Sequence, residues 1–147
     1  MYNILICDDD RDIVNALKLY LADPNYQMFE AFTGQEALDI MEEQDIHLIL
    51  MDIMMPEMDG ISMCRSLKGE LVTSHIPIIL LTAKDSIDDK ETGYESGADS
   101  YITKPFSSKL LKSRIHNLIM TRRRMSEYLM KQVQSLQHAE SGGGGRC

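Results

Sequence analysis

Short runs of apolar residues recur along most of the chain, and segments with a helical period lie between them. The runs cover residues 4–7, 26–31, 47–51, 76–81 and 100–103. Runs of this length, bounded by turn residues or charges, are typical of strands buried on both faces of a parallel sheet. The pattern therefore predicts five strands.

Apolar residues recur at helical spacing between and after these runs. They are Ile13, Ala16, Leu17, Tyr20 and Leu21, then Ala37, Leu38 and Met41, then Ile61, Cys64 and Leu67, and finally Leu110, Leu111, Ile115 and Leu118. Thr33 and Asp59 stand at expected helix starts. A further helix is expected over Asp85 to Gly97, with a thin apolar stripe of Ile87 and Tyr94. Five strands alternating with five helices predict an α/β fold with a doubly wound parallel sheet.

The last helical pattern is longer than the domain needs. An approximate heptad runs from Ile115 through Leu118, Arg122, Met125, Leu129, Gln132 and Leu136. Its spacing is coiled-coil-like, but Arg122 and Gln132 interrupt the apolar row. Two compatible interpretations follow: a dimerising or signal-transmitting stalk, and a linker helix cut from a larger protein. The helix is expected to end at about Gln137, before SGGGGRC (141–147), which reads as a flexible added tail.

Composition narrows the class of protein. The chain has 147 residues, and 23 acidic against 15 basic side chains give a net charge of -8. An acidic domain is a poor non-specific binder of nucleic acid. Three cysteines are too few for a disulfide framework and indicate a reducing cytoplasm. No apolar stretch approaches the ~18–20 residues of a membrane span, so no membrane partner is expected.

Polar side chains with the chemistry of a binding site follow four of the predicted strands. They are Asp8, Asp9 and Asp10 after the first, Asp52 after the third, Thr82 at the end of the fourth, and Lys104 and Pro105 after the fifth. Ligands bind at the carboxyl ends of strands in an open parallel sheet. Clustered carboxylates repel one another unless a cation intervenes, and Mg²⁺ prefers oxygen ligands. The alternative is that these acids only cap helices, which is the role expected for Asp10 and Asp12.

Such a pocket suits phosphoryl transfer. Asp52 can attack a phosphoryl donor as a nucleophile and form an acyl phosphate. Mg²⁺ would bridge a phosphoryl oxygen and the carboxylates, Lys104 would neutralise a second oxygen, and Thr82 would donate a hydrogen bond to a third. Two other classes of protein stay open. One is an aspartate-nucleophile phosphatase, although residues 7–11 of this chain do not match the usual motif of that class. The other is a degenerate module that serves only as a scaffold.

Four segments resemble the receiver domain of two-component response regulators, across roughly Tyr2 to Ile119. They are ILICDDD, LILMDIMMPEMDG, IPIILLTAK and GADSYITKPF. The resemblance, which is chemotaxis-receiver-like, implies a flavodoxin-like (βα)5 fold with strand order 2-1-3-4-5, followed here by an extended C-terminal helix. It also implies a cytoplasmic signalling domain that phosphorylates and dephosphorylates itself, rather than a turnover enzyme. The phosphoryl donor would be a histidine kinase or a phosphotransfer domain.

The resemblance assigns metal-binding roles to four residues. Asp9 and Asp52 should contact Mg²⁺ directly, Met54 should supply its backbone carbonyl, and Asp8 should act mainly through bound water. Met54 and Lys84 also occupy positions that modulate hydrolysis of the acyl phosphate in this family. Because the Met54 side chain cannot position an attacking water, we expect a phosphorylated form that is not specially short-lived.

The resemblance also implies a phosphate partner and a switch. Lys104 would contact the phosphoryl group, and Pro105, expected to follow a cis peptide bond, would shape its loop. Thr82 and Tyr101 match the family's switch pair, in which the hydroxyl moves toward the phosphoryl group and the aromatic ring turns inward. This movement would remodel the surface formed by the fourth helix, the fifth strand and the fifth helix.

The chain is expected to comprise a receiver at residues 1–119, a helical extension at 120–138 and a flexible tail at 139–147. An output DNA-binding domain is expected to be absent from this chain. The second half resembles receivers of hybrid sensor kinases that precede an AraC-type module, and the first half resembles free-standing regulators of Gram-positive bacteria.

A homodimer is possible through the switch surface or through the C-terminal helix. Regulators of the winged-helix class use charged residues on the switch surface to form a symmetric dimer. Thr92, Ser100 and Leu110 replace charged residues of that interface, although Asp99 and Arg114 are kept. These departures disfavour the salt-bridged dimer.

Overall fold

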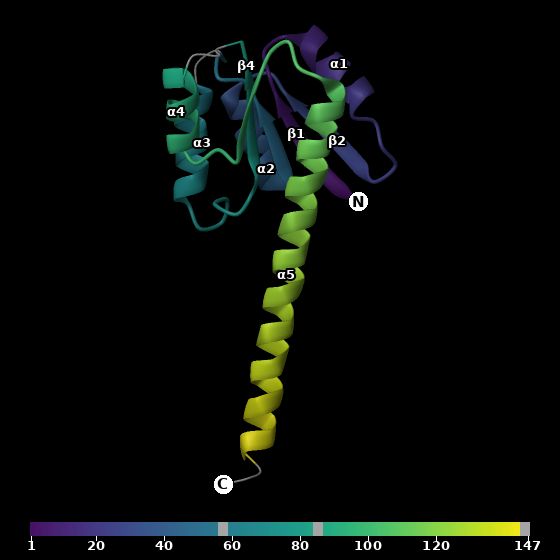
Figure 1. The fold of residues 1–147 in the computed structure, drawn as a ribbon, viewed down its shortest axis with the longest axis vertical. Helices are drawn as coiled ribbons and strands as arrows, with labels where there is room; N and C mark the ends of the chain where they lie inside the picture. The colour runs from purple at the N-terminus through teal and green to yellow at the C-terminus, as the bar shows by residue number, and fades with distance from the viewer. Residues whose placement is uncertain (56–58, 84–86, 145–147) are drawn as a thin grey trace. The chain divides into compact units, whose positions relative to one another are not determined.

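The computed structural model describes residues 1–55, 59–83 and 87–144, and it alternates strands with helices throughout (Figure 1). The strands are β1 (Tyr2–Cys7), β2 (Tyr26–Ala31), β3 (Leu48–Met51), β4 (Ile78–Thr82) and β5 (Ser100–Thr103). The helices are α1 (Arg11–Tyr20), α2 (Gly34–Glu43), α3 (Gly60–Gly69), α4 (Ile87–Glu95) and α5 (Ser108–Gly144). The predicted alternation is confirmed.

The five strands form one parallel sheet in the order β2-β1-β3-β4-β5. This is the order that the resemblance implied. Every residue of β3 and β4 is buried, as expected for central strands covered on both faces. The expectation that every strand is buried on both faces is wrong for β2, because this edge strand leaves Gln27 and Glu30 exposed.

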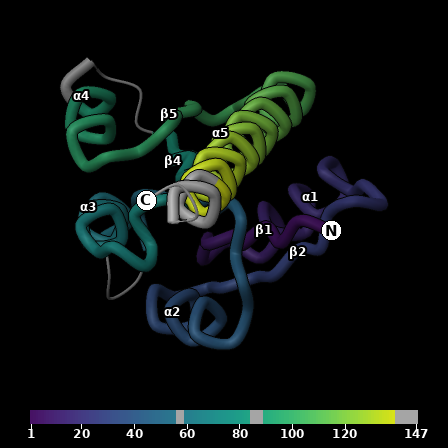
Figure 2. Tube along the Cα trace, turned by 90° about the horizontal axis from the view of Figure 1, so that it is seen from below, coloured from purple at the N-terminus to yellow at the C-terminus, as the bar shows by residue number. Residues whose placement is uncertain are grey.

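The core lies on both faces of the sheet because alternate strand residues point to opposite sides. One cluster joins Leu5, Ile49 and Leu80 of the strands to Cys64 and Leu67 of α3. Figure 2 shows α2 and α3 on one side of the sheet and α1 on the other. On the α1 side, the fully buried helix residues are Val14, Leu17, and, from the start of α5, Leu111 and Ile115.

Side-chain caps begin three of the helices, as the sequence predicts. The Asp10 carboxylate accepts hydrogen bonds from the backbone N–H groups of Asp12 and Ile13. Thr33 caps α2 and Asp59 caps α3 in the same way. Asp12 is not a cap, contrary to expectation, because it lies inside the first turn of α1.

Three apolar residues assigned to the apolar faces of helices are instead half-exposed. Tyr20 and Tyr94 are each 52% exposed, and Leu110 is 48% exposed. The buried face of α5 is set by Leu111 and Ile115, which are four residues apart, so the adjacent position turns roughly 100° away from the core. In α1 the core position that the sequence analysis missed is Val14.

A glycine brings α4 close to the sheet. A Cβ atom on Gly93 would lie 2.5 Å from Cδ2 of Tyr101 and 3.2 Å from Cδ1 of Leu80. The Tyr101 ring therefore occupies space that a side chain at this position would fill. Tyr94 on the same helix is 52% exposed, and its ring centroid lies 6.3 Å from that of Tyr101. The side chain of Ile87, the other expected apolar residue of α4, lies outside the described residues.

An ion pair joins α3 to the segment before β5. Nζ of Lys68 lies 2.8 Å from Oδ2 of Asp99 and donates to the carbonyl of Ile76, also at 2.8 Å. The same Asp99 oxygen accepts the backbone N–H of Ile78 at 2.8 Å. Gly97, with φ of +100°, makes the turn beside the Lys68 stem.

The chain divides into two compact units, Met1–Ile115 and His116–Cys147. Helix α5 runs to Gly144, which is seven residues beyond the predicted end at Gln137. The tail expected from Ser141 is therefore helical through Gly144, while residues 145–147 lie outside the described part. Ala139 and Glu140 are good helix formers, and a helix continues through glycine at a cost of only about 1 kcal/mol per residue.

Candidate functional site

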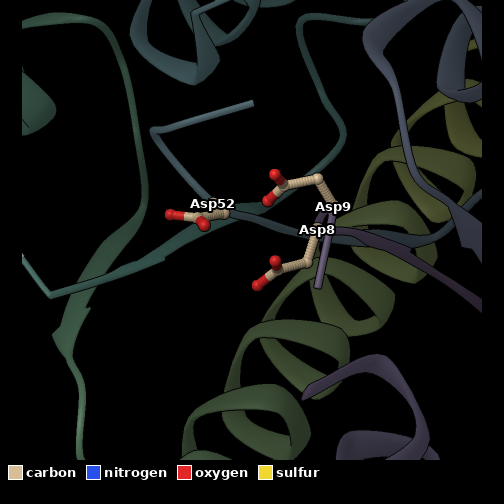
Figure 3. A group of neighbouring side chains, drawn as sticks. All are labelled: Asp8, Asp9 and Asp52. Atoms are coloured by element: carbon tan, nitrogen blue, oxygen red, sulfur yellow. The ribbon is translucent and has the colours of Figure 1, made fainter. Parts of the chain in front are cut away.

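Three carboxylates meet at the carboxyl ends of β1 and β3. Cys7 of β1 pairs with Met51 of β3, and the backbone N–H of Asp52 donates to the Cys7 carbonyl at 2.9 Å. Asp8 and Asp9 thus emerge beside Asp52, and one carboxylate oxygen from each of the three lies within 4.8 Å of the others (Figure 3). The predicted convergence of these residues is confirmed by the geometry.

Lys104 lies between two of the carboxylates. Its Nζ atom is 2.9 Å from Oδ2 of Asp8 and 3.5 Å from Oδ2 of Asp52. Asp8 is only 1% exposed, and its other oxygen accepts the backbone N–H of Asp10 at 3.0 Å. A buried carboxylate needs such compensation, because an isolated charge in the interior is very costly. The lysine therefore binds tightly to Asp8 and more loosely to Asp52.

Asp52 is held in a setting that opposes its ionisation. Burial raises the pKa of the Asp52 carboxyl above its usual value, and the negative charge of Asp8 adds to the rise. The ammonium of Lys104 and the backbone N–H of Met54, which donates at 3.3 Å, act in the opposite direction. Burial prevails, so added positive charge would favour the ionised form.

The donor set fits a hard divalent cation. It consists of the carboxyl groups of Asp8, Asp9 and Asp52, with the Lys104 amine beside two of them. Asp9 is exposed, which leaves the group open on one side. Oxygen-only ligands at the edge of a pocket suit Mg²⁺, which keeps several waters and takes one or two carboxylates.

The remaining predicted residues surround this group. Thr82 is buried at the end of β4, and its carbonyl accepts the backbone N–H of Lys104 at 2.7 Å. The Lys104–Pro105 peptide bond is cis, as the resemblance implied. Tyr101 is 8% exposed, so its ring already points inward, whereas the Met54 side chain is 63% exposed.

The sequence analysis missed the part that Gly60 plays in the loop after Asp52. A Cβ atom on Gly60 would lie 2.3 Å from the Asp52 carbonyl and 2.8 Å from Cα of Ile53, so only glycine allows this approach. Its N–H donates to the Ile53 carbonyl at 2.8 Å. The signal was present in the Asp59–Gly60 helix start, which was interpreted only as a cap. Lys84, assigned to hydrolysis of the acyl phosphate, lies outside the described residues.

Fold and site together define a doubly wound α/β protein with an acidic, lysine-containing pocket at its strand ends. The chain belongs to the response regulator receiver domain family, whose model matches residues 4–116. It is accordingly a receiver domain of the two-component signalling class, and such domains are signalling modules rather than conventional enzymes.

Several known proteins are similar to the chain over this region. It is 42% identical over 118 residues to a probable transcriptional regulator, ycf27, of Cyanidium caldarium, covering 80% of this chain and 46% of that protein. It is 40% identical over 115 residues to the heme response regulator HssR of Staphylococcus epidermidis, covering 78% and 50%. The chain thus spans about half the length of the curated relatives it matches.

Among solved structures, the receiver domain of a signal transduction histidine kinase from Syntrophus aciditrophicus is 36% identical, with a TM-score of 0.76. That match covers 82% of this chain and 92% of the other. No helix in the described part of the chain is long and apolar enough to cross a lipid bilayer.

Proposed function

We propose that Asp52 accepts a phosphoryl group from a histidine kinase or phosphotransfer domain in a reaction that depends on Mg²⁺. The observation that carries this proposal is the placement of the Asp52 carboxylate beside Asp8, Asp9 and the Lys104 ammonium at the strand ends. An oxygen of Asp52 forms the new P–O bond, and the P–N bond of the donor phosphohistidine breaks, so its electron pair returns to the imidazole.

Each neighbour of Asp52 has a defined task in this proposal. Asp8, Asp9, Asp52 and the carbonyl of Met54 hold the cation, with Asp8 acting mainly through bound water. A bound Mg²⁺ supplies positive charge that offsets the carboxylates and the transferred phosphoryl oxygens. Lys104 contacts one phosphoryl oxygen, a short movement for an ammonium that already lies 3.5 Å from Asp52.

Phosphorylation is proposed to act on the surface formed by α4, β5 and the start of α5. The Thr82 hydroxyl turns toward the phosphoryl group, and the inward position of Tyr101 is favoured. The strand register supports this route, because Thr82 pairs with Thr103 and Leu80 pairs with Tyr101. A modification that adds charge biases a two-state element in this way without creating a new fold. This surface is then available to an output partner or to a second copy.

Transfer of radioactive phosphate from a phosphorylated histidine kinase tests the proposal. The wild-type chain should be labelled in Mg²⁺ and not in chelator, and Asp52→Asn should remain unlabelled. Asp45→Asn is the matched control, because the Asp45 side chain is 90% exposed and remote from the cluster, so labelling should be unchanged. Label retained by Asp52→Asn would place the acceptor elsewhere. Rapid hydrolysis of a chromogenic phosphate ester would instead favour a phosphatase.

The lifetime of the phosphorylated form follows from the same loop. The Met54 side chain offers no hydrogen-bonding group for an attacking water. The chain can be phosphorylated with labelled acetyl phosphate, which is then removed. The label on the chain should persist for much longer than seconds. Decay within seconds would show that another residue positions the water.

A further inference from the structure

Helix α4 is held on the receiver with very little burial of side chains. Among residues 89–95, the part of this helix whose side chains the structure describes, only Gly93 is buried. Because Gly93 has no side chain, the helix backbone itself lies against the sheet at this point. A segment that buries so little apolar surface opens more easily than the core. The position of α4 therefore depends on the few contacts that it makes.

The Tyr101 ring is the closest neighbour of Gly93 outside its own helix. A Cβ atom at position 93 would lie 2.5 Å from Cδ2 and 2.8 Å from Cε2 of this ring. The ring is buried, and the half-exposed ring of Tyr94 lies against it with the two planes tilted by 42°. Their centroids are 6.3 Å apart, a separation at which aromatic rings attract each other. Gly93 thus makes room for the Tyr101 ring, and Tyr94 contacts it.

The C-terminal end of α4 is anchored separately from this contact. The Ser96 hydroxyl donates to the Gly93 carbonyl at 2.5 Å, and the Cys64 thiol of α3 donates to the Ser96 carbonyl at 3.7 Å. Ala98 then enters the core. If the Tyr101 ring left its place, the end of the helix would stay anchored while Gly93 lost its neighbour. Because protein interiors are close-packed, the ring and the middle of α4 must move together.

The same ring lies on the strand that leads to Lys104. Leu80 of β4 pairs with Tyr101 of β5, and Thr82 pairs with Thr103. The backbone N–H of Lys104 donates to the Thr82 carbonyl at 2.7 Å. Two paired strands therefore connect the ring with the two residues that are proposed to contact the phosphoryl group.

We propose that Gly93 and Tyr94 are positioning residues that hold the Tyr101 ring inward, and α4 on the sheet, before any phosphoryl group is present. This inference rests on the proposed function, in which phosphorylation of Asp52 favours the same inward ring. The switch of this chain is then set in advance. A state that already holds about nine tenths of the molecules can be enriched only about 1.1-fold. Phosphorylation should therefore change the position of the ring little in the wild type.

The position of the ring can be measured without a phosphoryl donor. NMR signals of ¹³C-labelled tyrosine rings broaden in the presence of a soluble nitroxide according to their exposure, and Tyr→Phe variants assign the signals. In the wild type the Tyr101 signal should broaden several-fold less than that of Tyr128, which is 60% exposed. Equal broadening of the two signals overturns the proposal. The measurement does not depend on whether Asp52 accepts phosphate.

Substitution of Gly93 tests what keeps the ring and the helix together. In Gly93→Ala the added Cβ collides with the ring, so either the broadening of Tyr101 or the amide hydrogen exchange of α4 should rise several-fold. Gly69→Ala is the matched control, because a Cβ there meets nothing within 4 Å, and it should change neither. A Gly93→Ala chain in which both quantities match those of the control overturns the proposal.

Substitution of Tyr94 tests the contact between the rings. Tyr94→Ala should increase the broadening of the Tyr101 signal, whereas Tyr94→Phe keeps a ring in place and should leave it unchanged. Tyr128→Ala, which removes an exposed ring far along α5, should also have no effect. Unchanged broadening in Tyr94→Ala overturns the role assigned to Tyr94.

The response to beryllofluoride distinguishes a switch from a purely structural contact. With Mg²⁺, beryllofluoride bound to a carboxylate mimics an acyl phosphate, and its binding is followed by ¹⁹F NMR. It should change the Tyr101 signal little in the wild type, but should return the broadening or exchange of Gly93→Ala toward the wild-type value. Asp52→Asn should not respond.

The outcomes of this experiment separate the two proposals. A large decrease in the broadening of wild-type Tyr101 when the mimic binds shows that the ring is not set in advance. A bound mimic that leaves Gly93→Ala unchanged shows a contact with no part in switching. Either result overturns the inference and leaves Asp52 as the acceptor. Absence of a bound ¹⁹F signal in the wild type overturns the proposed function instead.

Discussion

At the scale of single residues, two of the lysine–carboxylate pairs in the receiver differ in how far solvent reaches them. Lys104 and Asp8 approach to 2.9 Å with side chains 17% and 2% exposed. Lys18 and Glu30 approach to 3.3 Å with side chains 41% and 40% exposed. Solvent screens the second pair, whereas the first leaves a carboxylate buried if its partner is lost. The two pairs therefore allow a direct comparison.

Lys104→Met should destabilise the domain by about 3 kcal/mol in the absence of divalent cations, because Asp8 would remain buried and unpaired. Lys18→Met should cost less than about 1 kcal/mol. Urea unfolding of both variants at neutral pH measures the difference. Equal costs would show that water compensates Asp8, and that Lys104 is not its essential partner.

Asp52 should make the free energy of unfolding depend on pH. Because its pKa is raised in the folded chain, the protonated carboxyl contributes stability that is lost as the pH rises through that pKa. Asp52→Asn removes this loss of stability, so the variant should unfold at a higher temperature than the wild type at neutral pH in chelator. The difference in unfolding temperature should shrink as the pH is lowered toward about 4. Thermal unfolding across this range, with and without Mg²⁺, checks it, and a variant less stable at neutral pH would contradict it.

At the scale of elements, α4 is seated on the sheet through Gly93 and the Tyr101 ring. Gly93→Ala should gain helix propensity but collide with the ring, for a net loss of about 1–3 kcal/mol. Gly69→Ala is the control, since a Cβ there meets nothing within 4 Å, and it should stabilise by about 0.5–1 kcal/mol.

A double-mutant cycle identifies the ring as the cause. In a Tyr101→Ala background the ring contacts are gone and only Cδ1 of Leu80, at 3.2 Å, stays close to the added Cβ, so most of the cost of Gly93→Ala should disappear. Chemical unfolding of the four chains gives the coupling. If Gly93→Ala costs the same with and without the ring, another contact opposes the added methyl group.

The elements themselves were largely predictable, because strands buried on both faces give continuous apolar runs and helices give a 3.6-residue period. The errors occur where the period of apolar residues does not show which side of the element faces the core. Tyr20 and Leu110 lie next to the buried face of their helices, and a turn of about 100° per residue places them toward solvent. The edge strand β2 was misjudged because its apolar run does not reveal that one neighbour is missing.

At the scale of the whole molecule, the convergence of Asp8, Asp9 and Asp52 followed from topology, since parallel strands bring their carboxyl ends to one edge. The pairing of Lys104 with Asp8 did not follow, because it depends on the side-chain path of a residue 96 positions away. Gly60 was likewise missed, since a close backbone approach leaves no periodic signal in the sequence.

The two buried thiols report on opening of the whole receiver. Burial raises the pKa of both Cys7 and Cys64, which are at most 1% exposed, and so suppresses their reactive thiolates. In a Cys147→Ser chain in native buffer, a thiol reagent should modify Cys7 and Cys64 only slowly. In denaturant it should modify both thiols rapidly. Mg²⁺ should slow the reaction further, because a ligand of the folded state reduces its opening. A fast-reacting native thiol would contradict this.

The contacts of Asp99 restrict what a neighbouring molecule can gain at this edge of β5. One of its oxygens already serves both the Lys68 ammonium and the Ile78 amide within the same chain. An arginine from outside that binds both carboxylate oxygens would have to compete with these donors, and success would loosen the connection between α3 and the last strand. A partner at this position should therefore gain a single hydrogen bond to the remaining oxygen of Asp99 rather than a bidentate ion pair.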